Sequence, residues 1–373
     1  MGADGASADA DGSETEATAD TAGTRSEPGR TPVGVKLGST RTVLQYVCEG
    51  SVETVRTLTC LAKYEDALTG EKRVLFGEQA AQKYPDRVRY MLRSGLPEDD
   101  ESVDLAATFF EEVVTAEGLD ADSTDGPDAD SAVVYAIPTI DNEPGLRNLE
   151  RVIENSPVGD APVRSFPESL CGSIPAIGDD LEAIEQVFAA VNMGSTNLEA
   201  SAYRHGEQLS PFVSGAVTGN EVDRNIANAV EEETQGRVNI DLTTAREYKE
   251  DHADFEEFEP FTDVIQQPGG GAHEFTIERS VMEPLDDYID DAVDEVANNF
   301  LAQLANDHMK PYQLALSKPI VLTGGMACIP GIVDVFEERL SAALDRDVEC
   351  IAADRPDLAP AEGARRIAER LSE

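Results

Sequence analysis

The sequence predicts a duplicated α/β fold, in which two similar halves each begin with a β-hairpin. Two β-rich stretches with a Gly-Ser-Thr turn, at 33–46 and at 191–200, support this prediction, and helical patterns follow each of them. A third glycine turn comes later, where an apolar strand at 320–323 runs into Gly324-Gly325. The order of the three turns predicts that they cooperate around one ligand.

The charge of the chain is strongly negative. Its 29 Lys and Arg face 74 Asp and Glu, which gives a net charge of −45. A field of this sign repels nucleic acid and anionic lipid, so neither is an expected direct partner. The acidic residues are spread along the whole chain, a distribution that predicts a cytoplasm with very high salt, where screening suppresses self-repulsion.

Cysteine and histidine usage excludes two classes of site. The five cysteines stand singly without a CxxC pair, and the four histidines form no HExxH pair. Structural zinc and a disulfide framework are therefore not expected, whereas buried thiols in a reducing compartment are. No apolar run approaches the ~18 residues of a membrane span, and the N-terminus lacks the features of a signal peptide. We expect a soluble, cytoplasmic protein without a membrane anchor.

The first half predicts an acidic tail followed by strands and helices. Residues 1–31 are mostly small, polar or acidic, which predicts disorder, and a second acidic loop covers 121–131. The helical pattern that follows the first hairpin has Leu105, Phe109 and Val113 on one face. The expected elements are a hairpin at 33–46, a helix at 101–117, a buried strand at 133–138, a helix at 146–155 and a short strand leading to 166–168.

The second half predicts a similar alternation. Its longest helical pattern, at 282–308, repeats apolar residues that include Leu285, Ile289 and Val293. The other expected elements are a helix at 181–190, the strand-turn-strand at 191–200, helices at 221–233 and 243–251, a linker or hairpin turn at 266–271, the strand before Gly324, and closing helices at 333–344 and 360–371.

The three glycine turns suit a phosphate-containing ligand. Backbone N–H groups in Gly38-Ser39-Thr40 and in Gly194-Ser195-Thr196 can each form a concavity for phosphate oxygens, to which the hydroxyl groups add donors. The Gly324-Gly325 turn can admit a flat ligand because it has no side chains to hold the ligand away. Each turn alone is equally typical of an ordinary tight turn. Together they are more specific for a nucleotide.

These turns resemble three motifs of the actin superfamily, which includes actin, the bacterial rod-shape protein MreB, the plasmid-segregating ParM filaments, heat-shock chaperone ATPases and sugar kinases. Residues 33–42 resemble the first phosphate hairpin of that family. Residues 192–199 resemble the second, in its shorter ParM-type form, and residues 323–331 resemble the adenosine motif.

Further segments carry the same resemblance. Arg246, Lys249 and Glu250 match the Arg-x-x-Lys-Glu helix that actins place against adenine and ribose. Residues 74–81 resemble the MreB segment that returns from the small subdomain. Residues 354–356 with 362–364 resemble the closing strand-to-helix segment, so that the likeness covers about 32–371.

The resemblance implies an actin-like ATPase fold, with duplicated domains around an interdomain nucleotide cleft. It implies domain I at 32–170 (small subdomain about 57–90), domain II at 171–350 (small subdomain about 220–275) and a segment at 351–373 returning to domain I. ATP or ADP with Mg²⁺ are the implied cofactors. The implied nucleotide-binding residues are Lys36, Gly38, Ser39, Thr40, Asn192, Gly194, Ser195, Thr196, Arg246, Lys249, Glu250, Gly324, Gly325 and Met326.

The resemblance makes Glu168 the catalytic candidate, but two other positions depart from the family pattern. Glu168 stands where the family carries the residue that positions the attacking water, although it is also one acid among many. The family normally has Asp at Lys36 and Asn192, holding Mg²⁺ through its water shell. Lys36 can act instead as a point charge on phosphate, or point to solvent. Asn192 can accept a hydrogen bond from a metal-bound water, so we expect altered metal handling and slow hydrolysis.

The favoured function is that of an actin-like cytoskeletal protein, which binds and hydrolyses ATP and polymerises into dynamic filaments. Among the members of the family the chain looks like the haloarchaeal actin homologues. A chaperone would need a peptide-binding domain, and a sugar kinase would need a substrate loop with a catalytic Asp, which the sequence does not show. Other copies of the chain are the expected partner, and the cargo stays open. The alternatives are a non-polymerising, nucleotide-dependent regulatory or adaptor module and, less favoured, a small-molecule kinase.

Overall fold

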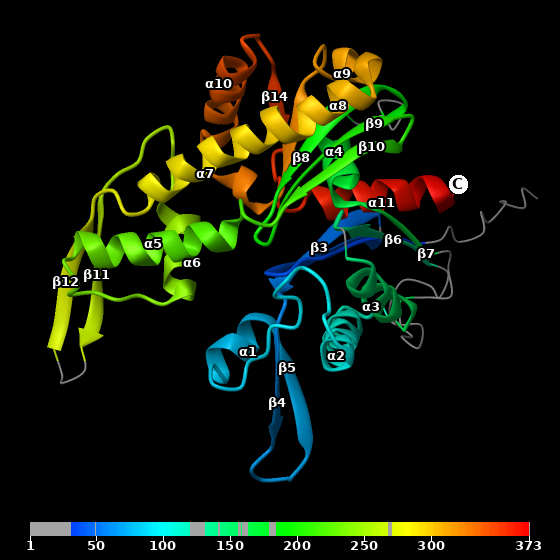
Figure 1. Ribbon diagram of the computed structural model, residues 1–373. Coiled ribbons are helices and arrows are strands. Elements are labelled where there is room, and N and C mark those ends of the chain that lie inside the picture. The colour runs from blue at the N-terminus through cyan, green and yellow to red at the C-terminus, as the bar shows by residue number, and fades with distance from the viewer. Residues whose placement is uncertain are drawn as a thin grey trace, which may run out of the picture.

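Two five-stranded sheets with the same strand order form the centre of the protein (Figure 1). The computed structural model describes residues 31–48, 50–119, 131–140, 142–155, 158, 163–178, 184–267 and 271–372. The expected acidic tail and most of the expected acidic loop at 121–131 lie outside these residues. Among the described helices, none is long and apolar enough to cross a membrane.

The two sheets are built in the same way. The first runs β3-β2-β1-β6-β7 and the second β10-β9-β8-β13-β14. In each, three strands pair antiparallel as a meander, and two later strands continue the sheet in parallel. This repetition confirms the predicted duplication. The strands are β1 Thr31–Leu37, β2 Arg41–Cys48, β3 Ser51–Leu58, β6 Ser131–Ile137, β7 Val163–Pro167, β8 Val187–Met193, β9 Leu198–Arg204, β10 Glu207–Ser214, β13 Ile320–Thr323 and β14 Cys350–Ala352.

Helices pack on the sheets through apolar faces. In the first half, α2 (Asp100–Ala116) and α3 (Glu143–Glu154) share a core with β1 and β6. The long helical segment expected at 282–308 is continuous and covers the second half with a larger core. It consists of α7 Met282–Asp294, a π-helical turn at Glu295–Leu301 and α8 Ala302–Asp307, and α9 Met309–Ala315 and α10 Ile332–Leu344 complete the layer.

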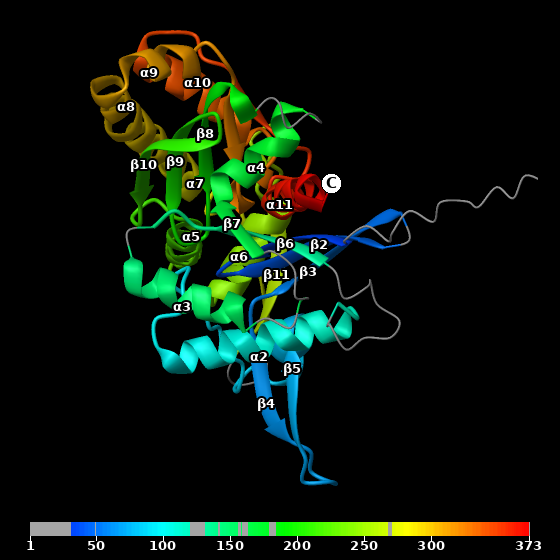
Figure 2. The same cartoon turned by 90° about the vertical axis from the view of Figure 1, so that its right-hand side faces the viewer.

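The last helix of each half packs against the sheet of the other half. Helix α4 (Glu168–Ile177) follows β7 but contacts β8 and β13, and α11 (Ala359–Ser372) follows β14 but contacts β1 and β6. The two helices also pack on each other between the sheets, as both views show (Figures 1 and 2). A Cβ at Gly363 would lie 1.9 Å from the carbonyl oxygen of Cys171. The helices therefore cross at contact distance, which only glycine permits.

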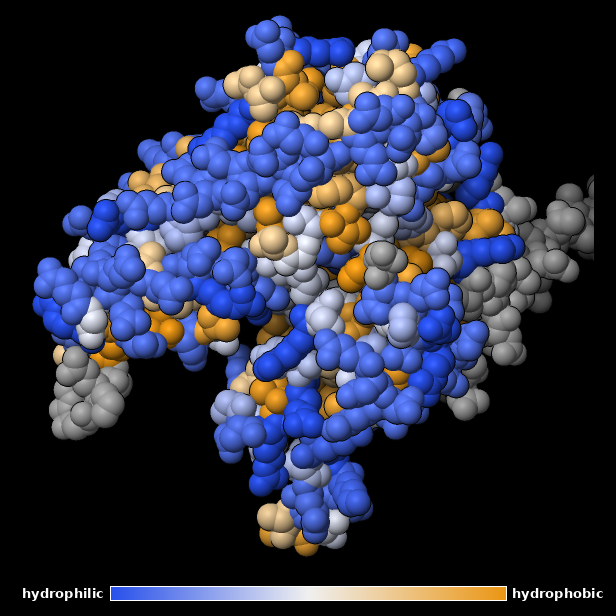
Figure 3. Space-filling view, viewed as in Figure 1, coloured by the Kyte–Doolittle hydropathy of each residue, from blue (hydrophilic) through white to orange (hydrophobic). Residues whose placement is uncertain are grey.

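A smaller arm extends from each half. In the first arm, β4 (Leu61–Glu65) and β5 (Lys72–Phe76) form a hairpin beside α1 (Gly77–Lys83). In the second, β11 (Phe261–Gln267) and β12 (Gly271–Ile277) form a hairpin near α5 (Gly219–Glu233) and α6 (Leu242–His252). The surface is hollowed between the two arms (Figure 3).

Most of the expected elements are present, but the helix expected at 181–190 is wrong. Residues 181–183 lie outside the described part, and Val187 begins the buried strand β8. Six of the seven residues of β8 are buried, so the segment shows a continuous apolar run in place of the alternation of a half-exposed strand. Helix α4 was not expected, because its sequence contains Gly172 and Pro175, which disfavour helices.

Candidate functional site

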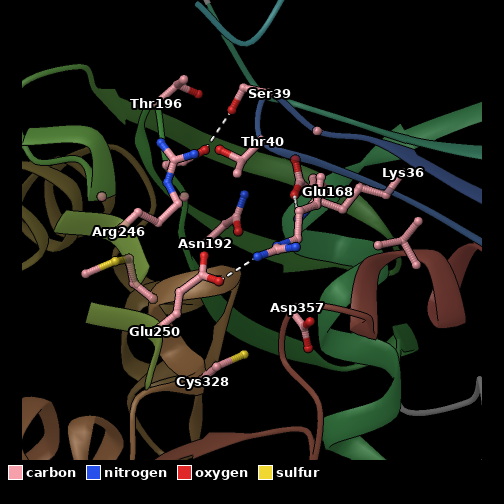
Figure 4. Close-up of a pocket in the computed structure, with 18 of the residues that line it drawn as sticks. Lys36, Ser39, Thr40, Glu168, Asn192, Thr196, Arg246, Glu250, Cys328 and Asp357 are labelled. Carbon is pink, nitrogen blue, oxygen red and sulfur yellow. Dashed lines mark hydrogen bonds and ion pairs between the residues drawn. The ribbon is translucent and has the colours of Figure 1, made fainter. Parts of the chain in front are cut away.

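A cavity of about 390 Å³ lies between the two halves, where the predicted motifs meet (Figure 4). Of the residues predicted for the site, only Gly324 does not line it. The others come from β1 and its turn, the start of α4, β8 and its turn, α6, and the segment after β13. Those lining residues are Lys36, Gly38, Ser39, Thr40, Glu168, Asn192, Gly194, Ser195, Thr196, Arg246, Lys249, Glu250, Gly325 and Met326.

The two Gly-Ser-Thr turns face each other. Ser39 Oγ lies 2.7 Å from Ser195 Oγ, so the tips of the two hairpins touch through their hydroxyl groups. A Cβ at Gly38 would lie 2.5 Å from the carbonyl oxygen of Arg41. The second turn also rests on the N-terminus of α5, because the Gly219 N–H donates to the Gly194 carbonyl oxygen. The backbone of both turns is thus held at one end of the cavity.

The glycine pair after β13 has two different environments. Gly324 has a φ of +93°, and a Cβ there would lie 2.5 Å from Asn192 Oδ1. Gly325 lines the cavity, and a Cβ there would have no described atom within 4 Å. The first glycine is therefore required by the fold, whereas the second leaves open space beside the cavity.

The helix with Arg246, Lys249 and Glu250 reaches the cavity from the second half. Lys249 Nζ donates to Asp223 Oδ1 at 2.5 Å and to the Gly219 carbonyl oxygen at 3.0 Å. Arg246 Nε donates to the other oxygen of Asp223 at 3.1 Å. Burial lowers the pKa of Lys249, whereas the charge of Asp223 acts in the opposite direction. The buried carboxylate of Asp223 therefore joins α5 to α6 and orients both cations.

One ion pair joins the two halves across the cavity, and another lies within its lining. Arg41 Nη2, on β2 of the first half, lies 2.5 Å from Glu250 Oε2 on α6 of the second half. Lys36 Nζ lies 2.7 Å from Glu168 Oε1, with both side chains at most 14% exposed. Lys36 thus does not point to solvent. Neighbouring Asn192 is buried, and its Oδ1 has no hydrogen-bond partner among the described residues.

The lining of the cavity contrasts with the charge of the chain. Six basic side chains line it against four acidic ones, although acidic residues are far more numerous in the sequence. Arg41, Arg56, Arg355 and Asp357 were not predicted for the site, although Arg41 and Arg355 lie in the segments at 33–42 and 354–356 that carry the family resemblance. An excess of cations in a cavity of this size suits an anionic ligand.

Comparison with known proteins identifies the family. The family model described as Salactin matches residues 30–372, which is most of the chain. The chain belongs to the salactin family. It is 64% identical over 340 residues to Salactin of Halobacterium salinarum (strain ATCC 700922 / JCM 11081 / NRC-1), covering 91% of this chain and 92% of that relative. The expected resemblance to haloarchaeal actin homologues is confirmed.

Solved structures with a fold similar to that of this salactin-family chain are actin-like proteins. The MamK double helical filament has a TM-score of 0.68 at 18% identity, covering 91% of this chain and 99% of MamK. MreB5 of Spiroplasma citri bound to ADP has a TM-score of 0.68 at 16% identity, covering 93% and 98%. The same MreB5 bound to AMPPNP has a TM-score of 0.69 at 16% identity, covering 92% and 97%. The predicted actin-like fold is confirmed.

Besides Asp223, sequence reasoning missed a second buried acid next to this salactin-family site. Glu199 is fully buried on β9, opposite Asn192 in the register of the sheet. It accepts from the Thr139 N–H at 3.0 Å and from Asn197 Nδ2 at 2.9 Å. Burial, followed by the charge of Glu168, raises the pKa of Glu199 to about 8. Its place directly after the second turn was visible in the sequence, but its burial was not.

The side chains of the salactin-family cavity do not fit a divalent ion held directly by the protein. Within the described ranges, no three His, Cys, Asp or Glu side chains are grouped to hold a metal. Glu168 is paired with Lys36, and both oxygens of Glu199 accept hydrogen bonds. Hard divalent cations prefer several carboxylate or carbonyl oxygens, whereas the buried side-chain oxygens of described residues that line the cavity without a hydrogen bond are Asn192 Oδ1 and Asp357 Oδ1, and the latter lies 3.5 Å from Arg355 Nε.

Proposed function

We propose that this protein is an actin-like cytoskeletal ATPase, which binds ATP between its two halves and polymerises into dynamic filaments. The observation that carries this proposal is a cavity with more basic than acidic side chains, lined by two opposed Gly-Ser-Thr turns, in a chain with a net charge of −45. The similar MreB5 structures are bound to ADP and to AMPPNP, which supports a nucleotide as the ligand.

In this proposal the phosphates lie between the turns. The N–H groups of the turns and the hydroxyl groups of Ser39 and Ser195 donate to phosphate oxygens, and the N-terminus of α5 adds a favourable dipole behind the second turn. The nucleoside lies against Gly325 and Met326, facing Arg246 and Glu250 of α6. The open space beside Gly325 supports this orientation.

Hydrolysis in this proposal relies on positioning. Glu168, the first residue of α4, faces the cavity and orients a water molecule in line with the γ-phosphorus. The new bond joins the water oxygen to the γ-phosphorus, and the bond to the oxygen that bridges the β- and γ-phosphorus breaks, which gives ADP and phosphate. Glu168 accepts the proton of the water late in this step. If Mg²⁺ accompanied the nucleotide, Asn192 Oδ1 would be able to accept a hydrogen bond from one of its water molecules.

The filament in this proposal is a head-to-tail array of copies of the chain. Such a contact is heterologous and does not close, so it extends into a filament. The net charge of −45 implies strong repulsion between copies at low salt, where the screening length is long. Assembly therefore requires high salt. MamK, which has a similar fold, forms a double helical filament, and this supports self-assembly on this fold.

Sedimentation of the purified protein tests this proposal. With ATP in molar KCl we expect a pelleted fraction, which decreases as KCl is lowered and is smaller with ADP or without nucleotide. Ser195→Asp places a carboxylate where phosphate is expected and should abolish the effect of ATP. The matched control is Ser51→Asp on exposed β3, which should assemble like the parent. Absence of assembly at every salt concentration would contradict the filament, and absence of ATP binding would contradict the site.

A further inference from the structure

Lys36 is a cation of the cavity that lies next to the first turn. It is the penultimate residue of β1, directly before the first turn, and its Cε lies 3.5 Å from the position of a Cβ on Gly38. The side chain therefore follows the turn instead of leaving it. Its Nζ lies 2.7 Å from Glu168 Oε1, and both residues line the cavity. A phosphate held by the turn would meet this ammonium group.

The groups around Lys36 carry little other charge. Asn192 is an amide, and burial followed by the charge of Glu168 raises the pKa of Glu199 to about 8, which favours its uncharged form. Glu168 is the acid that faces Lys36, with Oε1 2.7 Å from the ammonium nitrogen. Lys36 and Glu168 offset each other's charge before a ligand enters. The site already contains the ammonium group of Lys36. Among the described residues it has no group of carboxylates that could bind a metal cation.

We propose that Lys36 serves as the resident counter-ion of the triphosphate, moving from Glu168 to the phosphate when the nucleotide binds, so that binding needs little divalent metal. This inference rests on the proposed nucleotide site and adds how its charge is balanced. A triphosphate carries more negative charge than one carboxylate, so the exchange favours the phosphate. Lysine suits this role because its ammonium is a compact charge on a flexible stem.

The exchange has a consequence for Glu168. When Lys36 turns to the phosphate, Glu168 loses its partner but remains at the N-terminus of α4, where the helix dipole stabilises a negative charge. The bound phosphate and Glu168 then compete for one ammonium group. Removing the charge of Glu168 should therefore strengthen phosphate binding, whereas removing the charge of Lys36 should weaken it. If the phosphate and Glu168 compete for Lys36, neutralising the two partners of this ion pair should therefore change the affinity for phosphate in opposite directions.

Binding of a fluorescent ATP analogue, measured by anisotropy in molar KCl with EDTA or with Mg²⁺, tests the proposal. We expect the parent protein to bind in EDTA within about tenfold of its affinity in Mg²⁺. Lys36→Met should weaken binding in EDTA by roughly tenfold or more. Glu168→Gln should strengthen it. Lys63→Met, on the exposed part of β4, removes the same charge far from the cavity and should change neither affinity.

The outcomes separate this inference from the function on which it rests. A parent that binds with Mg²⁺ but not with EDTA, together with a Lys36→Met variant no weaker than Lys63→Met, overturns the counter-ion role and leaves the nucleotide site intact. A parent that binds in neither condition overturns the proposed function and this inference with it. If Lys36→Met fails to fold by circular dichroism, Glu168→Gln decides: unchanged or weaker binding in EDTA overturns the exchange.

Discussion

Ser39 Oγ and Ser195 Oγ lie 2.7 Å apart, although the two serines belong to turns in different halves of the protein. Each turn is fixed to its own sheet, β1–β2 in one case and β8–β9 in the other. A ligand held by both turns contacts both halves at once. Its binding therefore depends on the position of one half relative to the other. The site is therefore sensitive to any change in the angle between the two sheets.

The glycine pair after β13 provides two substitutions with opposite expected effects. Gly324→Ala should destabilise the protein by at least about 1–3 kcal/mol, because alanine disfavours a φ of +93° and its Cβ would overlap Asn192 Oδ1. Gly325→Ala should leave stability nearly unchanged, because its Cβ enters open space, but should weaken ATP binding. Thermal unfolding and nucleotide titration check the pair. Equal loss of stability in both variants would contradict the assigned environments.

The buried carboxylate of Asp223 should be essential to the second half. Asp223→Ala leaves Lys249 buried without its charged partner, which typically costs about 3–5 kcal/mol. Lys249→Met should cost less, because Asp223 keeps its pair with Arg246. The control is Glu221→Gln, which alters an exposed pair one turn away and should stay within about 0.5 kcal/mol. Urea unfolding gives the free energy of unfolding of all three variants. An Asp223→Ala variant as stable as the parent would contradict the structural role of the Asp223 pairs with Arg246 and Lys249.

The Arg41–Glu250 pair should slow the release of nucleotide. It joins the two halves across the cavity, yet both side chains are partly exposed, at 23% and 38%, so its contribution is at most about 1 kcal/mol. Arg41→Met should accelerate release by roughly two- to fivefold and reduce its dependence on salt. Arg147→Met, which breaks an exposed pair with Glu143 on α3, is the control. Stopped-flow displacement of a labelled nucleotide gives the release rates of the parent and of Arg41→Met. Equal rates would show that the Arg41–Glu250 pair does not slow release.

Glu199 should make stability fall as pH rises. Its pKa in the folded protein is about 8, above the ordinary value of 4.5, so the folded state binds more protons between these two values. The stabilisation is fully present below the unfolded pKa and is lost as pH rises through about 8, and each pKa unit corresponds to about 1.4 kcal/mol. Glu199→Gln should flatten this part of the profile. Unfolding at constant salt from pH 5 to pH 9 measures the difference, and parallel profiles would show that Glu199 is not the group.

The features that could be predicted are those that depend on residues close together in the sequence. The turns at Ser39 and Ser195 and the pair Gly324-Gly325 each have a local signal, since glycine after a strand allows backbone conformations that other residues disfavour and so marks a turn. The duplicated fold follows from the repetition of these signals. The helical motif of α6 was found for the same reason, because Arg246, Lys249 and Glu250 lie close together in the sequence of one helix.

The missed features depend on residues that only the fold brings together. The pairing of Lys36 with Glu168, and of Arg41 with Glu250, joins segments far apart in the chain. The burial of Glu199 depends on Asn197 and Thr139, which satisfy a carboxyl group that would otherwise be expected at the surface. Residues 187–190 of β8 were predicted as part of a helix because both faces of this strand are covered. In each case, tertiary packing decided what local sequence left open.

The exchange of α4 and α11 between the halves has a consequence for the order of folding during synthesis. The face of β6 that α11 covers is apolar, and the ribosome makes α11 after every other described element. The apolar face of the first sheet therefore stays exposed to solvent while the second half is translated. A growing chain in this state exposes strand surfaces that attract other chains. We expect truncation before Ala359 to yield aggregates in place of a shorter folded protein.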